Sequence, residues 1–347
     1  MAVTIKDVAN EAGVSIATVS HVINKTRYVG DELTDRVNNA IKKLGYYPNQ
    51  LVGSLRNKKT YTVGLVLPSI SNETFGLFTE IIQKMLFKFG YNLIICNTSH
   101  DIVLEEEAFN TMLMKKVDAI IAIPVSSNSQ KLREIQDKGV PIVLVDRVIE
   151  DFEVDTVRVD NFKGTYEIVK YLINIGHSSI GYIDRKVAQS HSIDQRMGYK
   201  KALEDNGIPY DELKVISSSG YDYEAGIDSV KALLNRANNI TAVCAYYDIT
   251  AFGAMRGILD IGYHIPDDIS VVGYDGMPFT AVSYPRLTTV ITPVDKLAHE
   301  ACNLVIKRLE TKYNQDRIKI KIEKKEDIVI VPELIIREST SSPLRHT

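Results

Sequence analysis

The chain from Tyr61 onward consists of short, almost wholly apolar runs separated by amphipathic segments, and this alternation constrains the fold most. The first series of runs is VGLVLPS, NLIICNT, AIIAIPV, PIVLVDR and TVRVD, and the second is SIGYID, AVCAYYD and SVVGYDG. The segments between them, such as RMGYKKALEDNG and ITAFGAMRGILDIG, have helical periodicity. Continuous apolar strands that alternate with helices are typical of parallel sheets covered on both faces. We therefore predict an α/β body of two lobes, each built on a doubly wound parallel sheet.

Length and composition exclude several classes of protein. The 347 residues correspond to roughly two to three domains, and 45% hydrophobic with 24% charged residues excludes disordered, collagen-like and disulfide-scaffold chains. No apolar run approaches the roughly 20 residues of a membrane span, and the start MAVTIKDVANEAGVS does not resemble a signal peptide. We expect a soluble cytoplasmic protein without a cofactor or a metal. Cys96, Cys244 and Cys302 are widely spaced, which favours reduced thiols packed in the core.

Charge is distributed unevenly along the chain. Residues 1–60 contain nine Lys and Arg against five Asp and Glu, a net charge of +4, whereas the rest of the chain carries −7. A small basic segment attached to a large acidic body suggests that the segment binds a polyanion while the body has another task.

The basic segment contains three short helical patterns. The first begins behind Thr4, includes Asp7 as part of an imperfect capping box, and has apolar residues at helical spacing: Ile5, Val8, Ala9 and Ala12. Gly13 then permits a left-handed turn, and Ser15 is a good N-cap for a second helix. Val19, Val22 and Ile23 are its apolar residues.

The third helical pattern follows Gly30-Asp31-Glu32 and ends at Gly45, with Val37, Ala40, Ile41 and Leu44 on its apolar face. Two helices joined by a tight turn, with a third that buries their apolar faces, form a helix-turn-helix arrangement. The spacing alone also allows a plain three-helix cap whose Lys and Arg form a solvated face. Against this, Ile16, Ala17, Ser20 and His21 leave the outward side of the second helix open to base edges, and Thr18 and Ser20 suit phosphates.

The stretch TIKDVANEAGVSIATVSHVINKTRYVGDELTDRVNNAIKKLGYYPN resembles the headpiece of the lactose-repressor/galactose-repressor family of bacterial transcriptional regulators. Within it, SHVINKTR is particularly similar to the purine and ribose repressors. Many relatives carry Arg where His21 stands, although the purine-type repressors share the His. The resemblance implies that residues 1–46 bind double-stranded operator DNA, with the second helix in the major groove. The implied DNA-binding residues, including three in the next segment, are Thr4, Ser15, Ile16, Ala17, Thr18, Ser20, His21, Asn24, Arg27, Tyr46, Asn49, Leu55 and Arg56.

Residues 47–60 are predicted to form a hinge or linker. The stretch QLVGSLRNKKT is too short to be a stable helix by itself, and Gly53 weakens it further. The resemblance implies a hinge helix that forms when two protomers bind operator side by side, with Leu55 as a wedge in the minor groove. Arg56, Lys58 and Lys59 would then contact phosphates.

In the body, polar and aromatic residues that follow strands are the candidates for ligand binding, because doubly wound sheets bind ligands beyond the carboxyl ends of their strands. Each has a structural alternative: an Asp there is often a helix N-cap, an Arg a surface ion pair and a Tyr a core residue. Together they form a set able to bind hydroxyl groups and stack on a ring. The candidates are Phe75, Asp146, Asp160, Arg196, Tyr221, Tyr247 and Asp275.

The family resemblance extends through YLINIGH, QRMGYKKAL, TAVCAYYDITAFGAM and IPDDISVVGYDG to LTTV, which implies an effector-binding and dimerisation core over residues 61–340. We place lobe 1 at about 61–160 plus 293–325, lobe 2 at about 161–292 plus 326–340, and a loose tail at 341–347. The resemblance implies that Phe75 and Tyr221 stack on the effector, that Arg196 and Asp275 bind its polar edge, and that Asp146 and Asp160 assist. Tyr247 stands where sugar-binding relatives carry Asn. The last segment lacks the leucine heptads of a tetramer, so we expect a dimer.

These observations predict a dimeric transcriptional repressor whose affinity for operator DNA is controlled by a small sugar or sugar derivative. A purine- or nucleoside-responsive repressor of the same family is the alternative, and activation and corepression stay open. A solute-binding protein would explain the core but not the basic headpiece. An α/β enzyme is not expected, since GxSxG, GxxxxGK[ST] and HExxH motifs are absent from the sequence.

Overall fold

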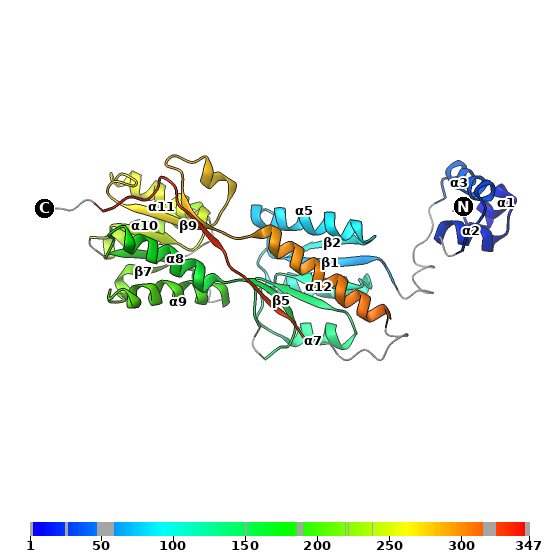
Figure 1. Cartoon of the computed structure of the whole chain (residues 1–347), viewed down its shortest axis with the longest axis horizontal. Coiled ribbons are helices and arrows are strands. Elements are labelled where there is room, and N and C mark those ends of the chain that lie inside the picture. Colours follow the sequence, from blue (N-terminus) through cyan, green and yellow to red (C-terminus); the bar gives the residue numbers. More distant parts are fainter. Residues whose placement is uncertain are drawn as a thin grey trace. The chain divides into compact units, whose positions relative to one another are not determined.

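The computed structural model describes residues 3–24, 27–46, 59–149, 151–185, 190–218, 220, 222–237, 239–314 and 324–343. The chain divides into two compact units, Met1–Thr60 and Tyr61–Thr347 (Figure 1). In the described part of the chain, none of the helices has the length and apolar character needed to cross a membrane.

The first unit contains helices α1 (Ile5–Ala12), α2 (Ile16–Asn24) and α3 (Asp31–Leu44), as the three helical patterns predict. Asp7 accepts hydrogen bonds from the backbone N–H of Thr4 at 2.8 Å and from its hydroxyl at 2.7 Å, which fixes the start of α1. Gly13 ends α1 at a φ of 63°, a conformation that favours glycine. A small core joins the three helices, and its buried members are Val8, Ala9, Ala12, Val19, Val37 and Ala40.

Arg36 on α3 stabilises the turn between α1 and α2. Its Nε and Nη2 donate to the carbonyl oxygen of Ala12 at 3.1 and 2.7 Å, so a side chain of the third helix caps the last turn of the first. Ser15 caps α2, because its Oγ accepts from the backbone N–H of Thr18 at 3.0 Å. These bonds hold α2 in a fixed orientation against the other two helices.

The second unit contains two sheets, as the apolar runs predict, and each sheet has six strands (Figure 1). The first lobe has strand order β11-β5-β4-β3-β1-β2, and all its pairings are parallel. Its strands are β1 (Thr62–Leu67), β2 (Asn92–Asn97), β3 (Ala119–Ala122), β4 (Ile142–Val145), β5 (Asp155–Val159) and β11 (Asp327–Ile330). Its helices are α5 (Glu73–Lys88), α6 (Ile102–Met114), α7 (Gln130–Asp137) and α12 (Val294–Asn314).

The second lobe has strand order β12-β10-β9-β8-β6-β7, and only β12 runs antiparallel to its neighbour. Its strands are β6 (Ile180–Arg185), β7 (Val215–Ser218), β8 (Ala242–Ala245), β9 (Ser270–Asp275), β10 (Thr288–Ile291) and β12 (Glu333–Ile335). Its helices are α8 (Asn161–Asn174), α9 (Ser190–Asp205), α10 (Tyr223–Arg236) and α11 (Asp248–Asp260), with short 3-10 turns η1 (Glu212–Lys214) and η2 (Pro278–Ala281). Gly226 and Gly253 let the backbones of α10 and α11 approach closely.

Each lobe has a core on both faces of its sheet, as a doubly wound fold requires. Cys302 is buried in the first lobe and Cys244 in the second, whereas Cys96 is partly buried. Burial raises the pKa of all three thiols. The predicted role of these side chains in core packing is therefore confirmed for Cys244 and Cys302.

The chain passes between the lobes three times. It leaves the first lobe after β5, returns between β10 and α12, and leaves again between β11 and β12. The predicted boundaries near residues 160 and 292 agree with these passages, but the boundary at residue 326 is wrong. Asp327–Ile330 pairs with β5 in the first sheet, so the third passage lies at residues 331–332.

The C-terminal segment also differs in part from the predicted loose tail at 341–347. It contains two strands, one for each sheet, and the residues beyond them are held by the second lobe. Ser339 is fully buried. Its carbonyl oxygen accepts from the Val271 N–H at 2.8 Å, its hydroxyl donates to the Val271 carbonyl at 2.6 Å, and its N–H donates to the Arg286 carbonyl at 3.0 Å. The Ser341 carbonyl lies 2.9 Å from His177 Nε2. The described start of the predicted tail is therefore part of the fold.

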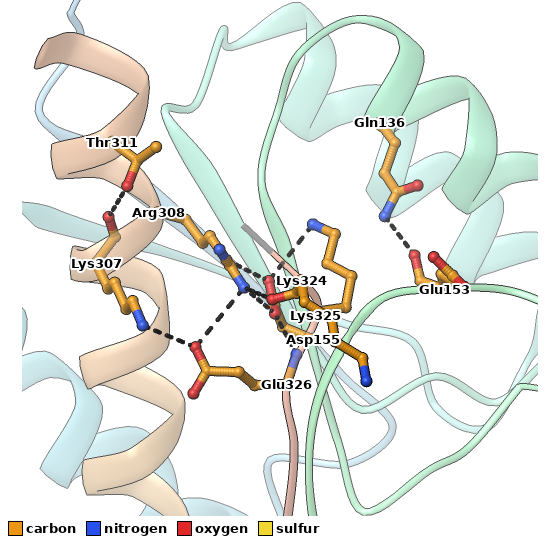
Figure 2. Close-up of polar contacts among 9 residues, drawn as sticks. All are labelled: Gln136, Glu153, Asp155, Lys307, Arg308, Thr311, Lys324, Lys325 and Glu326. Atoms are coloured by element: carbon orange, nitrogen blue, oxygen red, sulfur yellow. Dashed lines mark hydrogen bonds and ion pairs between the residues drawn. The ribbon is translucent and has the colours of Figure 1, made fainter. Parts of the chain in front are cut away.

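A buried ion pair connects α12 with the start of β5 in the first lobe (Figure 2). Arg308 on α12 donates from Nε and Nη2 to the two carboxylate oxygens of Asp155 at 2.8 and 2.7 Å. Arg308 also donates to the Lys324 carbonyl at 2.9 Å, while the Glu326 N–H donates to Asp155 at 3.0 Å. Lys325 Nζ lies 3.5 Å from the same carboxylate. This cluster, here called the β5 clamp, joins α12 and the segment before β11 to the sheet.

Candidate functional site

Helix α2 presents an accessible side as the sequence analysis predicts. Val19 is fully buried, whereas Ile16 is 43% exposed although it is a large apolar residue. Ala17 is exposed, and Ser20 and His21 are half-buried. Since the apolar face of α2 is occupied by the headpiece core, these side chains lie on the opposite, accessible side of the helix.

The other predicted DNA-binding residues have varied surroundings. Thr4 and Ser15 are occupied as helix caps, and the Thr18 hydroxyl lies 2.9 Å from that of Ser15. Asn24 donates to the Ser20 carbonyl at 2.9 Å. Arg27 is exposed, whereas Tyr46 packs against the headpiece core. Asn49, Leu55 and Arg56 lie outside the described residues, as does most of the predicted hinge at 47–60.

A cavity of about 630 Å³ lies between the two lobes of the second unit. Its walls come from the carboxyl ends of strands and the helix starts that follow them, which is where a doubly wound sheet binds ligands. Of the predicted residues, four line it, namely Phe75, Asp146, Tyr247 and Asp275. The first lobe also contributes the start of α5 and its preceding loop, including Ser69, Ser71, Asn72 and Thr74.

Asp146 and Asp275 share an unusual backbone conformation at the cavity. Asp146 follows β4 with a φ of 59°, and Asp275 ends β9 with a φ of 111°. Non-glycine residues rarely adopt these angles, and such strain gathers at ligand-binding positions. Burial raises the pKa of Asp146 to about 6, and burial together with the nearby Asp248 and Asp146 raises that of Asp275 well above its ordinary value. Both carboxyl groups therefore hold a proton more tightly than an exposed aspartic acid does.

Tyr247 lines the cavity beside Arg185. Its hydroxyl accepts a long hydrogen bond of 3.5 Å from Arg185 Nη1, and burial raises its pKa. The neighbouring Asp248 is fully buried and does not line the cavity. It accepts from the backbone N–H of Met277 at 2.7 Å and from the Thr289 hydroxyl at 2.6 Å, so it fixes the loop after β9. The pair Tyr247-Asp248 thus combines one cavity residue with one structural residue.

Two predictions about this site need correction. Arg196 is not among the cavity residues and instead contacts Asp184 at 3.3 Å, Tyr210 at 3.0 Å and Glu212 at 3.0 Å. Gln195, one position earlier, lines the cavity. Successive helical residues point about 100° apart, so choosing Arg196 in the QRMGY stretch selected the wrong face of α9.

Asp160 has the structural role that the sequence analysis named as its alternative. Its carboxylate accepts from the Lys163 N–H at 2.9 Å and caps α8, and it is not among the residues that line the cavity. Tyr221, the second predicted stacking residue, lies outside the described residues.

Several polar cavity residues were not among the predicted ones, principally His100, Arg147, Asn161, Arg185 and Gln195. Arg147 and Arg185 each stand at the end of an apolar run, in PIVLVDR and SIGYIDR, where the same reasoning about strand ends could have found them. Gln195 does not follow an apolar run, and a polar residue early in a helix is too common to indicate a binding site.

The chain matches two family models that together cover most of its length. Residues 4–49 match the "Bacterial regulatory proteins, lacI family" model, and residues 60–327 match "Periplasmic binding proteins and sugar binding domain of LacI family". This chain belongs to the LacI family. Members of the LacI family are ligand-responsive DNA-binding transcriptional regulators, so the headpiece and the lobed body have the order that this family requires.

Individual relatives of the LacI family match over nearly the whole chain. The HTH-type transcriptional regulator DegA of Bacillus subtilis is 33% identical, with 98% of this chain and 99% of DegA covered. A transcriptional regulator CelR–cellobiose complex is 27% identical with a TM-score of 0.72, covering 97% of this chain and 99% of that one. A lac repressor dimer bound to operator and an anti-inducer is 23% identical, covers 98% and 100%, and has a TM-score of 0.84. This last similarity concerns the fold alone.

Proposed function

We propose that this LacI-family regulator is a dimeric repressor whose affinity for operator DNA is set by a small sugar or sugar derivative in the interlobe cavity. The observation that carries the proposal is the cavity itself. Its volume of about 630 Å³ suits a ligand of that size, and its walls combine apolar side chains with many polar ones. The CelR relative was solved with cellobiose, which supports a carbohydrate-like effector.

Helix α2 is the element that we propose enters the major groove. Its accessible side carries Ile16, Ala17 and His21, which offer methyl contacts and one imidazole for base edges. Exposed basic residues such as Arg27 would contact phosphates. Leu55 remains our proposed minor-groove wedge on the strength of the sequence resemblance. Since a DNA-binding regulator acts where the chromosome is, we propose a cytoplasmic location. We also propose that the protein has no enzymatic activity, because its relatives are transcriptional regulators.

Dimer formation is supported by exposed apolar side chains on both lobes. Phe87 at the end of α5 is 78% exposed, and Val282 and Tyr284 after η2 are 76% and 96% exposed. Large accessible apolar groups of this kind mark protein interfaces when they gather on a surface. The lac repressor of similar fold was solved as a dimer on operator, which agrees with a second copy as the partner.

The proposed control is a shift between two arrangements of the lobes. Because the cavity has walls from both lobes, a ligand there binds one interlobe angle better than another and moves the population toward it. Two headpieces of a dimer would then change their spacing, and operator affinity would change with it. A coupling free energy of about 1–3 kcal/mol is typical of such systems.

The first experiment selects DNA from a random duplex library with the full-length protein and measures affinity for the selected sequence. Ala17→Glu places a carboxylate on the accessible side of α2 and is expected to weaken binding at least tenfold. Asn38→Glu adds the same charge at an exposed position of α3 and serves as the matched control. Equal affinity of the Ala17→Glu variant and the parent would refute α2 as the reading helix.

The second experiment screens sugars, sugar derivatives, nucleosides and purine bases by thermal shift, because a ligand that binds only the folded state raises the melting temperature. A stabilising ligand that also changes the affinity for the selected DNA supports the proposed control. A stabilising purine would replace the sugar with the alternative effector class. A ligand that fills the cavity and leaves DNA affinity unchanged would overturn the control mechanism.

A further inference from the structure

Asp118 connects the start of β1 with the end of α12 in the first lobe. It lies directly before β3 and is 3% exposed. Its carboxylate accepts hydrogen bonds from the Tyr313 hydroxyl at 2.7 Å and from the Thr62 N–H at 3.4 Å. Its own N–H donates to the Thr62 carbonyl at 2.7 Å, and its carbonyl accepts from Lys312 Nζ at 3.2 Å. These four residues are here called the Asp118 junction.

The two partners of Asp118 on α12 are partly withdrawn from water. Tyr313 packs against the core of the first sheet. Burial first, and then the hydrogen bond to Asp118, raise the pKa of Tyr313, so its hydroxyl stays protonated and donates. Burial also lowers the pKa of Lys312, although the charge of Asp118 acts against this. Because a hydrogen bond to a carboxylate is stronger than one between neutral groups, the junction holds the end of α12 firmly against the start of β1.

Three elements meet at the Asp118 junction, and the opposite end of each contributes to the cavity. β1 begins at Thr62, β3 follows Asp118, and α12 ends one residue after Tyr313. At their other ends, residues of these elements or directly after them line the cavity, namely Pro68, Ser69, Ile123, Pro124, Val294 and Leu297. Helix α12 has 21 residues and spans about 30 Å, and its apolar side packs on the sheet. The first-lobe walls of the cavity and the junction therefore belong to one packed body.

The predicted hinge at 47–60 is followed at once by this junction. The carbonyl of Tyr61, the first residue after the hinge, accepts from the Asn92 N–H at 2.8 Å, and its ring lies 5.8 Å from that of Tyr91. Tyr61 has a φ of 51°, a conformation that a residue other than glycine keeps only where its surroundings hold it. The chain that connects the headpiece with the body therefore has a fixed end beside Thr62.

We propose that Asp118 and Tyr313 are positioning residues for operator binding. By fastening the start of β1 to β3 and α12, they make the end of the hinge follow the first lobe. Neither residue lines the cavity, and both lie outside the headpiece, so they act on DNA affinity only through the segment that they hold. This inference rests on the proposed function, since it names residues through which the body of that regulator controls its headpieces.

The physical reason is the effective concentration of the second headpiece. When one headpiece of a dimer is bound to the operator, the other binds in an intramolecular step whose strength depends on the length and stiffness of the connection. If the first residues of β1 detach from the sheet, the connection gains residues and freedom, and closing the complex costs more entropy. Operator affinity therefore falls when the junction is opened.

The test measures the affinity of full-length variants for the duplex that the parent protein selects from the random library. Tyr313→Phe and Asp118→Ala are each expected to weaken binding by about fivefold. Asp118→Asn should lose less, because it keeps an acceptor oxygen for the Tyr313 hydroxyl. Tyr199→Phe is the matched control, since it removes a buried hydroxyl that donates to the Ile180 carbonyl at 2.9 Å in the second lobe. Its affinity for the duplex should equal that of the parent.

Hydrogen exchange reports whether the junction has opened, independently of DNA. The peptide that covers residues 61–66 should exchange about tenfold faster in Tyr313→Phe and Asp118→Ala than in the parent. In Tyr199→Phe the faster exchange should instead appear in the second lobe, in the peptide that covers residues 180–185. Melting curves of each variant establish that it is folded.

A double variant connects the exchange result with DNA binding. Insertion of one glycine and one serine between Thr60 and Tyr61 lengthens the same connection directly and is expected to weaken binding of the duplex by about fivefold. Adding Tyr313→Phe to the insertion should then cost less than about twofold more, because the two changes free the same joint and their effects are not additive. Adding Tyr199→Phe to the insertion should cost nothing further.

Several outcomes would overturn this inference. They are faster exchange at residues 61–66 with unchanged DNA affinity, an equal loss of affinity in Tyr199→Phe, and fully additive losses when Tyr313→Phe is combined with the insertion. The first of these would assign the junction to the stability of the first lobe alone. A parent protein that selects no duplex would refute the proposed function and this inference together, whereas a parent that selects one and a Tyr313→Phe variant that binds it equally would refute only the inference.

Discussion

The second unit buries guanidinium and carboxyl groups in two places, and the two places are built differently. In the β5 clamp, Arg308 meets Asp155 through two hydrogen bonds of 2.8 and 2.7 Å, with backbone groups satisfying both partners further (Figure 2). At the cavity, Arg147 and Arg185 instead lie close enough to repel each other, and Asp146 and Asp275 have raised pKa values. The clamp pairs opposite charges through direct hydrogen bonds, whereas the cavity brings two like charges close together. Buried charged groups therefore join elements of the fold at the clamp, whereas at the other site they line a cavity.

The largest effect is expected at the clamp. Arg308→Met removes the partner of a fully buried carboxylate and should lower the free energy of unfolding by about 3–5 kcal/mol. Urea denaturation followed by circular dichroism measures the loss. If the loss comes from the stranded charge, combining Arg308→Met with Asp155→Leu restores most of the stability. A double variant as unstable as the single one would contradict this explanation.

The pH dependence of the two sites should have opposite signs. Burial acts to raise the pKa of Asp155, but the hydrogen bonds from Arg308 and the Glu326 N–H leave it lowered. The stabilisation from Asp155 is then complete above its unfolded pKa of about 4 and is lost as the pH falls through the folded value.

At the cavity the sign is reversed, because the folded pKa of Asp275 is raised. Its contribution is present below about pH 4 and declines as the pH rises toward the folded value, by up to about 1.4 kcal/mol per pH unit. Asp275→Asn should therefore gain stability relative to the parent as the pH rises from 5 to 8. Melting temperatures across that range, without ligand, measure the difference. A parent and variant with parallel pH profiles would show that Asp275 is not protonated in the folded state.

A smaller effect is expected from Gln195. Its Oε1 is buried without a hydrogen-bond partner among the described residues, and its Nε2 makes only a 3.4 Å bond to the Tyr246 carbonyl. Gln195→Leu should raise the free energy of unfolding without ligand by about 1 kcal/mol and abolish binding of the effector. Chemical denaturation and calorimetry give the two readouts. Loss of stability together with unchanged binding would assign Gln195 to the fold and not to the site.

The smallest effect is expected from the exposed part of the clamp region. Lys307 pairs with Glu326 at 3.0 Å, but both side chains are largely solvated. Lys307→Met should change stability by about 0–1 kcal/mol, and less at 0.5 M salt. Because both variants replace a basic residue of α12 by Met at adjacent positions, Lys307→Met is a matched control for Arg308→Met. A loss as large as that of Arg308→Met would mean that burial is not what separates the two positions.

Much of the fold could be predicted from the sequence because the strands are buried on both faces and therefore almost purely apolar. Strand β7 was missed because VISS has only two apolar residues and lies at the edge of its sheet. The last boundary between lobes was misplaced because β11 and β12 are separated by two residues only. No local pattern distinguishes which sheet a short terminal strand joins.

The site was predicted where its chemistry depends on strand ends, as for Asp146 and Asp275. Arg196 was chosen in place of Gln195, since a guanidinium is the more conspicuous ligand group and helix phase cannot be read from so short a motif. Arg147 and Arg185 were overlooked individually, and their importance comes from proximity across two lobes, which only the tertiary structure supplies. Tyr221 and Leu55 remain predictions.

The three passages of the chain between the lobes also govern the order in which the protein is completed during synthesis. When residue 292 has left the ribosome, the second sheet lacks only β12, but the first lobe still lacks α12 and β11. Helix α12 provides much of the apolar surface on one face of the first sheet, so a lobe begun at residue 61 is finished only after most of its neighbour has been translated. Neither lobe is a contiguous folding unit. Nascent chains would therefore expose one face of the first sheet until α12 has been synthesised. Packing of α12 on that face would end its exposure to chaperones and proteases.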